Sequence, residues 1–294
     1  MTKHMSDTDL FSAFKELDDS EEVREDYIRA PLTWPGSKYR FLDKILPILP
    51  YRKVFVDVFG GSGSVILNRK PSELDVYNDR FGGVVAFYRC LRDKEKMDKV
   101  IEWLENTVHS REEFIWCKET WENSINDVER AAKWYYMTQT SFSGLGRAFA
   151  RQTNSKFTPT VHKRLELFPA MHERLKTIQI ENLSWKQCMK DFDGPRTVFY
   201  LDPPYLDTDT GCYRVKFTAD DHKELVSVIK NTTGYVALSG YDDNYIYNRE
   251  TFWDNRLAWE VTSGMMPNAF TQTNNQKEDN RVKRKVKECL WIKS

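Results

Sequence analysis

Cysteine is scarce in this chain of 294 residues, and its few copies form no pattern. The five cysteines are Cys90, Cys117, Cys188, Cys212 and Cys289, an odd number without a C-x-x-C pair. Structural zinc sites and disulfide frameworks both depend on regular cysteine spacing. The sequence therefore predicts five reduced cysteines, no bound metal and no disulfide.

Long hydrophobic runs are also missing. No stretch approaches the roughly 18 consecutive apolar residues that a membrane-spanning helix needs. The N-terminus opens with polar and acidic residues and lacks the apolar segment of a secretory signal. These absences predict a soluble protein that stays in the cytoplasm.

Net charge is absent as well, since 44 basic residues balance 44 acidic ones. A neutral total argues weakly against nucleic-acid binding, which usually relies on a basic surface. The charges are unevenly distributed, however. Residues 6–29 carry nine acidic and three basic residues, whereas residues 131–180 carry eight basic and two acidic ones. We expect an acidic N-terminal arm and a basic region that is either a solvated surface or a nucleic-acid contact.

Strand and helix patterns alternate after the arm. Residues 54–59 form an apolar run that ends in glycines, and residues 74–77 form a second. Residues 64–69 and 84–91 have helical character and follow these runs. Strand, helix, strand, helix is the repeating unit of a parallel α/β sheet.

Strand signals fade between residues 95 and 185, where aromatic residues recur at helical spacing. Strand character returns at 197–201, 235–239 and 288–292, with a helix at 219–230 and a polar loop at 263–287. The predicted fold is α/β, a Rossmann-like sheet interrupted by a mainly helical insertion. We expect a mobile arm at 1–29, a main domain at 30–94 and 186–294, and an insertion at 95–185.

The first candidate ligand-binding motif runs from Asp57 through Phe59, Gly60, Gly61 and Ser62 to Gly63, where a strand enters a helix. Glycines there allow a ligand to approach the backbone closely. The dinucleotide pattern G-x-G-x-x-G fails, because Ile66 stands where the third glycine belongs. The alternative ligand is S-adenosylmethionine, which has no pyrophosphate and needs only a close turn, and a tight turn that binds no ligand is the other possibility.

Asp79 ends the second predicted strand, roughly 20 positions after the glycine turn. An acid there can accept hydrogen bonds from both ribose hydroxyls of a nucleoside. The same residue could equally cap the following helix.

The most specific motif is Asp202-Pro203-Pro204-Tyr205, directly after the strand at 197–201. Two prolines fix the backbone of the turn. The Asp202 carboxylate and the Pro203 carbonyl are then two hydrogen-bond acceptors with fixed directions, and they suit the two hydrogens of an exocyclic amine. Such an amine is a poor nucleophile until its lone pair is localised, and we expect Tyr205 to stack on the base.

These motifs resemble those of the Dam-type DNA adenine methyltransferases of bacteria and their phages, over residues 31–292. The segment from Pro31 to Lys38 resembles the first family motif, residues 57–63 the cofactor loop, and residues 202–205 the catalytic motif. Residues 217–222 and 238–242 resemble the segments that follow. Residues 141–147, Ser-Phe-Ser-Gly-Leu-Gly-Arg, resemble the segment that contacts DNA.

The resemblance implies a role for each matching residue. The residues implied to bind the cofactor are Trp34, Lys38, Asp57, Phe59, Gly60, Gly61, Ser62, Gly63, Asp79 and Asp202. The implied catalytic residues are Asp202, Pro203, Pro204 and Tyr205. The implied DNA contacts are Ser143, Arg147, Arg151 and Lys156, and the insertion becomes a target-recognition domain in a bacterial or phage-infected cell.

The function expected from this resemblance is transfer of a methyl group from S-adenosylmethionine to the N6 amine of a flipped-out adenine in double-stranded DNA. We expect direct transfer without a cysteine nucleophile. His222 fits a capping or packing role better than a catalytic one, and the aromatic stripe from Trp103 to Trp134 fits a helix core. Other possibilities remain open: methylation of the exocyclic nitrogen of cytosine, an RNA substrate, and a DNA-binding regulator that has lost catalysis.

Overall fold

The computed structural model describes residues 27–150, 160–206, 217–262 and 285–294. Most of the expected acidic arm lies outside these ranges, as do Arg151, Lys156 and Cys212. None of the helices within the described ranges is long and apolar enough to span a membrane.

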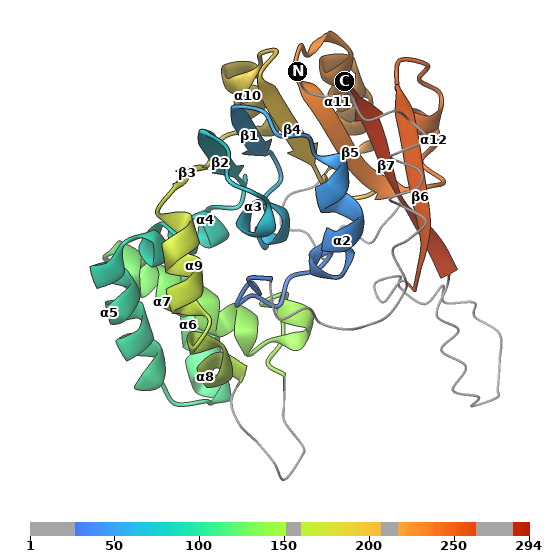
Figure 1. The fold of residues 1–294 in the computed structure, drawn as a ribbon. Coiled ribbons are helices and arrows are strands. Elements are labelled where there is room, and N and C mark those ends of the chain that lie inside the picture. The colour runs from blue at the N-terminus through green and yellow to red at the C-terminus, as the bar shows by residue number, and fades with distance from the viewer. Residues whose placement is uncertain (1–26, 151–159, 207–216, 263–284) are drawn as a thin grey trace, which may run out of the picture.

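The described residues form one seven-stranded sheet in the order β3-β2-β1-β4-β5-β7-β6 (Figure 1). Neighbours from β3 to β5 are parallel, whereas β7 runs antiparallel to both β5 and β6. The strands are β1 (Val54–Asp57), β2 (Leu74–Asn78), β3 (Ile178–Glu181), β4 (Thr197–Leu201), β5 (Tyr235–Tyr241), β6 (Asn255–Thr262) and β7 (Lys285–Lys293).

The central strands are buried on both faces. Alternate side chains of β1 enter different cores: Phe55 joins one hydrophobic cluster and Val56 joins the other. The second cluster receives Cys188 from α10 (Trp185–Phe192) and Leu225 from α11 (Ala219–Asn231). The first cluster is much larger and includes the helices of the insertion. Helices on both faces explain why β1 and β4 read as continuous apolar runs.

Two groups of helices fill the remaining space, and Figure 1 shows those of the insertion gathered below one end of the sheet. The first group is η1 (Tyr39–Phe41), α2 (Leu42–Ile45), η2 (Leu46–Ile48), α3 (Ser64–Asn68) and α4 (Gly82–Arg92), with α12 (Tyr245–Asn248) near the C-terminus. The second group is α5 (Lys94–Glu105), α6 (Arg111–Thr120), η3 (Trp121–Asn123), α7 (Asp127–Gln139), η4 (Phe142–Gly144), α8 (Thr160–Leu165) and α9 (Phe168–Leu175).

Local caps explain several helix starts. Ser110 accepts a hydrogen bond from the backbone of Glu113 at the start of α6, and Thr218 forms a capping box with Asp221 at the start of α11. The expected helix at 219–230 and the expected strands at 74–77, 197–201, 235–239 and 288–292 all occur.

Two strands escaped the sequence analysis. The strand β3 lies inside the segment 95–185, which was expected to be a mainly helical insertion, and it joins the main sheet by pairing with β2. Its four residues, Ile178–Glu181, alternate between buried and more exposed positions, but four residues are too few for a strand pattern to be recognised in the sequence. The missed β6 pairs along its whole length with β7, which a local pattern does not show.

The basic region at 131–180 is less exposed than its composition indicates. Lys133 is buried and pairs with Glu129, while Arg174 pairs with the buried Asp75 of β2. Arg164 donates to the side chain of Gln139 and to the carbonyl of Pro31. Three of the eight basic residues of this region therefore make internal contacts, and two more, Arg151 and Lys156, lie outside the described residues.

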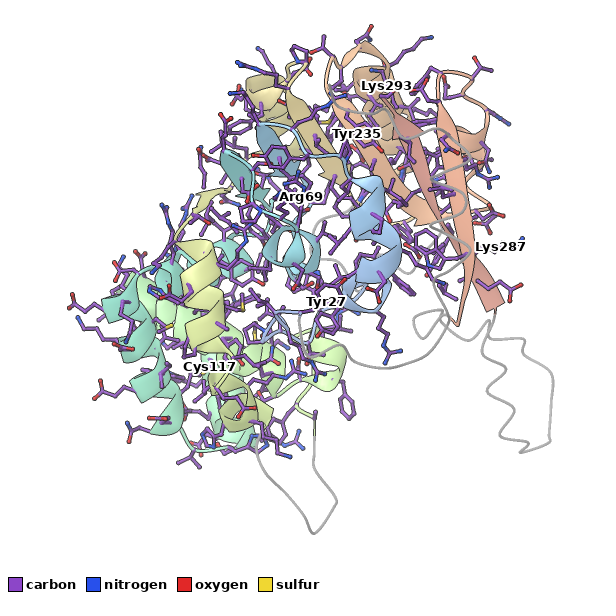
Figure 2. The ribbon with its side chains drawn as sticks, in the orientation of Figure 1. Tyr27, Arg69, Cys117, Tyr235, Lys287 and Lys293 are labelled. Atoms are coloured by element: carbon purple, nitrogen blue, oxygen red, sulfur yellow. The ribbon has the colours of Figure 1, made fainter. Side chains whose placement is uncertain are left out.

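The aromatic stripe forms a helix core, as expected. Phe114, Trp121, Trp134 and Tyr135 are all buried, and Tyr135 stacks on Phe87. Trp103 is only partly buried and stacks on Trp116, which has 42% of its surface exposed beside the Lys133 ammonium. In Figure 2 the labelled Cys117 lies among these helices, whereas Tyr235 lies on the sheet side of the molecule.

Candidate active site

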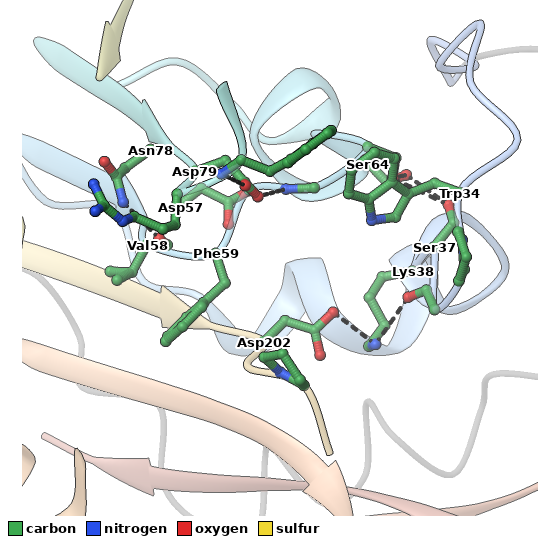
Figure 3. Close-up of a pocket in the computed structure, with 18 of the residues that line it drawn as sticks. Trp34, Ser37, Lys38, Asp57, Val58, Phe59, Ser64, Asn78, Asp79 and Asp202 are labelled. Carbon is green, nitrogen blue, oxygen red and sulfur yellow. Dashed lines mark hydrogen bonds and ion pairs between the residues drawn. The ribbon is translucent and has the colours of Figure 1, made fainter. Parts of the chain in front are cut away.

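The strand order creates a crevice at the carboxyl ends of β1 and β4. The chain crosses from β1 to β2 on one side, and from β4 to β5 on the other. Ligands of open α/β sheets bind where the strand order reverses in this way. A cavity of about 290 Å³ lies there, and its lining includes Asp57 at the end of β1 and Asp202 directly after β4 (Figure 3).

The glycine turn after β1 forms one wall of the cavity. Gly60 donates its backbone N–H to Asn78 at 2.7 Å, and Gly63 donates to Gly60 at 2.7 Å. Gly61 and Gly63 have φ values of 49° and 69°. A Cβ on Gly61 would lie 2.6 Å from the indole nitrogen of Trp34. The turn therefore requires glycine both for its backbone conformation and for the close approach of Trp34.

Asp79 braces this turn from the end of β2. Its Oδ2 accepts a hydrogen bond from the Gly61 N–H at 2.8 Å, and its Oδ1 accepts one from Phe81 at 2.7 Å. Burial raises the pKa of Asp79 to about 6, although the two backbone hydrogen bonds oppose the shift. A carboxylate oxygen has more than one acceptor site, so both oxygens keep capacity for ligand hydroxyls.

Asp57 is buried beneath the same turn. Its Oδ1 makes no hydrogen bond with any of the described residues. Burial, together with the charges of Asp202 and Asp79, raises the pKa of Asp57 well above its usual range. An orphaned buried acceptor is costly, and a ligand that donates a hydrogen bond or carries a positive charge would relieve that cost.

Asp202 and Lys38 form an ion pair across the cavity. The Lys38 ammonium lies 2.7 Å from Oδ2 of Asp202 and also donates to the Gly36 carbonyl at 3.0 Å. Oδ1 of Asp202 makes no hydrogen bond within the described residues. Burial raises the pKa of Asp202, and the Lys38 charge opposes this shift. Lys38 therefore holds the carboxylate through Oδ2, and Oδ1 can accept a hydrogen bond from a ligand.

Tyr205 lies next to this ion pair rather than in the cavity lining, to which the DPPY turn contributes Asp202 and Pro204. The Lys38 ammonium is 4.9 Å from the centre of the Tyr205 ring. The Tyr205 hydroxyl donates to Glu288 and lies 3.1 Å from the Ser239 hydroxyl. Base stacking by Tyr205 stays a prediction.

Aromatic side chains form the apolar wall of the cavity. Trp34 and Phe59, both expected, line it together with Phe81, Trp185 and Phe217. The rings of Phe59 and Phe217 meet edge to face with centres 5.6 Å apart. Sequence reasoning missed Trp185 because it follows β3, the strand that also went unrecognised.

The turn at 141–149 borders the cavity from the insertion. An isolated bridge joins Ser141 to Phe149, and Gly144 and Leu145 line the cavity. Gly144 has a φ of 72° and packs so closely on the Thr33 carbonyl that a Cβ would overlap it. The Arg147 side chain is exposed, and its backbone carbonyl accepts a hydrogen bond from Lys118 at 2.8 Å. Of Ser143, the structure describes only the backbone.

His222 is fully buried in α11. Its Nδ1 is hydrogen bonded to the Tyr247 hydroxyl, and its ring packs on the edge of Phe217. His222 is not among the residues that line the cavity. The packing role expected from the sequence is therefore the one that the structure shows.

The sheet order and the position of the cavity define a Rossmann-like methyltransferase fold. Within that class, the chain belongs to the D12 class N6 adenine-specific DNA methyltransferases, whose family model matches residues 34–265. The match includes the glycine turn, Asp79 and the DPPY motif, which are the residues on which the resemblance rested.

Curated relatives agree with this assignment. The chain is 26% identical over 231 residues to the Type II methyltransferase M.FokI of Planomicrobium okeanokoites, covering 72% of this chain and 34% of the relative. It is 27% identical over 234 residues to the modification methylase StsI of Streptococcus sanguinis, covering 74% and 33%. It is 25% identical over 231 residues to a DNA adenine methylase of Vibrio cholerae, covering 74% and 81%. The chain thus spans about a third of the length of the first two relatives and most of the third.

Proposed function

We propose that this chain transfers a methyl group from S-adenosylmethionine to the N6 amine of adenine in double-stranded DNA. The observation that carries the proposal is the Asp202 carboxylate, which lines the cavity with Oδ2 bound to Lys38 and Oδ1 without a hydrogen bond in the described part of the chain. Membership of the D12 class supports a methyl donor and a DNA substrate.

The cavity fits a cationic nucleoside. Four carboxylates, Asp57, Asp79, Asp202 and Asp221, line it together with two cations, Lys38 and Arg80. This excess of negative charge suits S-adenosylmethionine, whose sulfonium when bound supplies an electrophilic methyl group. Asp79 would accept hydrogen bonds from the ribose hydroxyls, Asp57 would face a donor of the ligand, and Trp34 and Phe59 would enclose the apolar parts.

Asp202 would act on the amine of the base. Its Oδ1 would accept one amine hydrogen and the Pro203 carbonyl the other, which localises the nitrogen lone pair. The bond from Lys38 to Oδ2 fixes the rotation of the carboxylate, so this acceptor is aimed before the base arrives. Methylation makes the amine more acidic, so the proton can pass to water afterwards.

Direct transfer fits the cysteines of the chain. Cys90, Cys117, Cys188 and Cys289 are buried, and none of these four lines the cavity. Burial raises the pKa of Cys90 to about 11 and that of Cys188 to about 12, so neither is a thiolate near neutral pH. We propose no covalent enzyme intermediate.

The DNA would approach along the turn at 141–149. Arg147 is exposed on this turn while Gly144 and Leu145 face the cavity. We propose Arg147 and Ser143 as DNA contacts, and also Arg151 and Lys156, which lie outside the described residues. Adenine must leave the duplex to reach the cavity, which costs a few kcal/mol that such contacts would offset.

The test is to identify the methylated nucleoside. Unmethylated duplex DNA is incubated with the full chain and S-adenosylmethionine that carries a deuterated methyl group, then digested and analysed by mass spectrometry. Labelled N6-methyladenine is the expected product. Labelled N4-methylcytosine, or no labelled nucleoside from DNAs of varied sequence, would contradict the proposal.

A further inference from the structure

Glu288 is a buried acid that the sequence analysis did not single out. It lies on β7 opposite Tyr241 of β5 and Trp259 of β6, with 3% of its surface exposed. Tyr241 is the last residue of β5, so this register brings Glu288 to the carboxyl edge of the sheet. The same edge holds Asp202, which follows β4.

The Glu288 carboxylate joins three groups around the site. Its Oε1 accepts hydrogen bonds from the Tyr205 hydroxyl and from the Ser239 hydroxyl, the latter at 3.3 Å. The same oxygen lies 3.6 Å from the Lys38 ammonium, which is 2.7 Å from Asp202. Lys38 is therefore shared between the buried carboxylate of Glu288 and the partly buried carboxylate of Asp202.

The charge of Glu288 requires an explanation. A neutral glutamine oxygen could also accept the hydrogen bonds from Tyr205 and Ser239, although more weakly than a carboxylate does. A buried carboxylate instead carries a desolvation cost, and burial raises the pKa of Glu288 while Lys38 opposes the shift. Lys38 is the cation whose interaction needs the negative charge.

We propose that Glu288 is a positioning residue for methyl transfer, because it shares the charge of the Lys38 ammonium with Asp202 and anchors the Tyr205 end of the DPPY turn. The inference rests on the proposed function. With Glu288 charged, Lys38 binds Oδ2 of Asp202 without neutralising the carboxylate fully. Oδ1 therefore remains a strong acceptor for the amine of the target base.

Replacing the charge of Glu288 has a defined electrostatic effect on Asp202. The groups that face Asp202 are Lys38, Asp57 on β1, Tyr200 on β4, Tyr205, Tyr247 on α12 and Glu288 on β7. Glu288→Gln removes one negative charge from this set, which lowers the pKa of Asp202. If transfer requires ionised Asp202, the acid limb of the rate profile moves to lower pH.

The experiment compares wild type, Glu288→Gln and Lys287→Gln in steady-state methyl transfer to duplex DNA across a pH series. Lys287 is the neighbouring residue on β7 and is exposed, as its labelled side chain in Figure 2 shows. We expect Glu288→Gln to lower kcat by about tenfold or more, as loss of a hydrogen-bonded charge does. We also expect its acid limb to shift to lower pH, whereas Lys287→Gln should match wild type.

Two further measurements separate positioning from a purely structural role. Affinity for S-adenosylmethionine, measured by calorimetry, should change much less than kcat in Glu288→Gln. Glu288→Asp keeps the charge on a shorter side chain, so it should retain the wild-type acid limb even if its kcat falls. This variant replaces Glu288→Gln in the test if Glu288→Gln does not fold.

Opposite results would overturn the inference. A Glu288→Gln variant with wild-type kcat, or one whose kcat and thermal stability fall together while the acid limb stays in place, would contradict it. If wild type and Lys287→Gln both fail to methylate DNA, the proposed function itself is wrong. That result differs from a defect confined to Glu288→Gln.

Discussion

Asp79 links the pH of the solution to cofactor binding. When ionised, its carboxylate can accept hydrogen bonds from the ribose hydroxyls. Burial raises the pKa of this carboxyl group to about 6. Above that pH the acceptor is charged, and below it the proton competes with the ligand. We therefore predict that affinity for S-adenosylmethionine, measured by calorimetry, weakens as the pH falls through about 6. Asp79→Asn should bind weakly without this dependence, and an equal pH dependence in the variant would contradict the role of Asp79.

A substitution at Gly61 tests whether the glycine turn must lie close to Trp34 for the cofactor to bind. Alanine there would adopt an unfavourable positive φ, and its Cβ would press on the Trp34 indole. We predict that Gly61→Ala weakens S-adenosylmethionine binding about tenfold or more, since strain and displacement of this size cost roughly 1–3 kcal/mol. Gly194→Ala is the matched control because its Cβ would meet Thr197 at an ordinary 3.9 Å. Equal affinities for the two variants would count against the role assigned to the turn.

At the scale of elements, the turn at 141–149 is where the insertion meets the cavity. Arg147 is exposed there, whereas Arg196 is exposed at the opposite, amino end of β4. We predict that Arg147→Ala weakens duplex binding about tenfold, in line with roughly 1–3 kcal/mol for a good arginine contact to DNA. Fluorescence anisotropy with a labelled duplex measures this, and Arg196→Ala should bind as wild type does. Indistinguishable affinities would remove Arg147 from the interface.

The sequence predicted elements best where a long signal was present. The strand β4 was placed at its observed bounds because all five of its residues are buried and the DPPY turn ends it. The short β3 and the edge strand β6 are defined by their partners, so local patterns could not reveal them.

The residues of the candidate site could likewise be predicted only where a local sequence signal marks them. Asp57, Asp79 and Asp202 could be identified because each is the last residue of a strand or directly follows one, beside a turn motif. Glu288 was missed because nothing around it in the sequence marks it. It is brought to the site by the pairing of β7 with β5, which connects residues distant in the chain.

At the scale of the whole molecule, a buried charge cluster ties the insertion to the sheet. Asp75 of β2 pairs with Arg174 of α9 and lies 3.6 Å from Arg69, and Arg174 also donates to the Ile66 carbonyl of α3. We predict that Asp75→Asn lowers the free energy of unfolding by about 3–5 kcal/mol, because it leaves two buried guanidinium groups uncompensated. Urea titration measures the loss. Asp98→Asn, which breaks the exposed pair with Lys94, should cost less than about 1 kcal/mol.

A small loss in Asp75→Asn would mean that water reaches this cluster and that the helices of the insertion are held by packing alone. A large loss accompanied by unchanged cofactor binding in the folded fraction would show that the cluster supports the fold without shaping the cavity.

The central claim is that Asp202 acts on the target amine rather than holding the cofactor in place. The most direct test measures S-adenosylmethionine affinity and single-turnover methyl transfer on the same samples of wild type and Asp202→Ala. Wild type should produce N6-methyladenine, and Asp202→Ala should transfer roughly 100- to 1000-fold more slowly, as loss of an aimed polar group in an active site does. Its cofactor affinity should fall far less. Transfer by Asp202→Ala at the wild-type rate, or a loss of transfer fully explained by lost cofactor binding, would contradict the account.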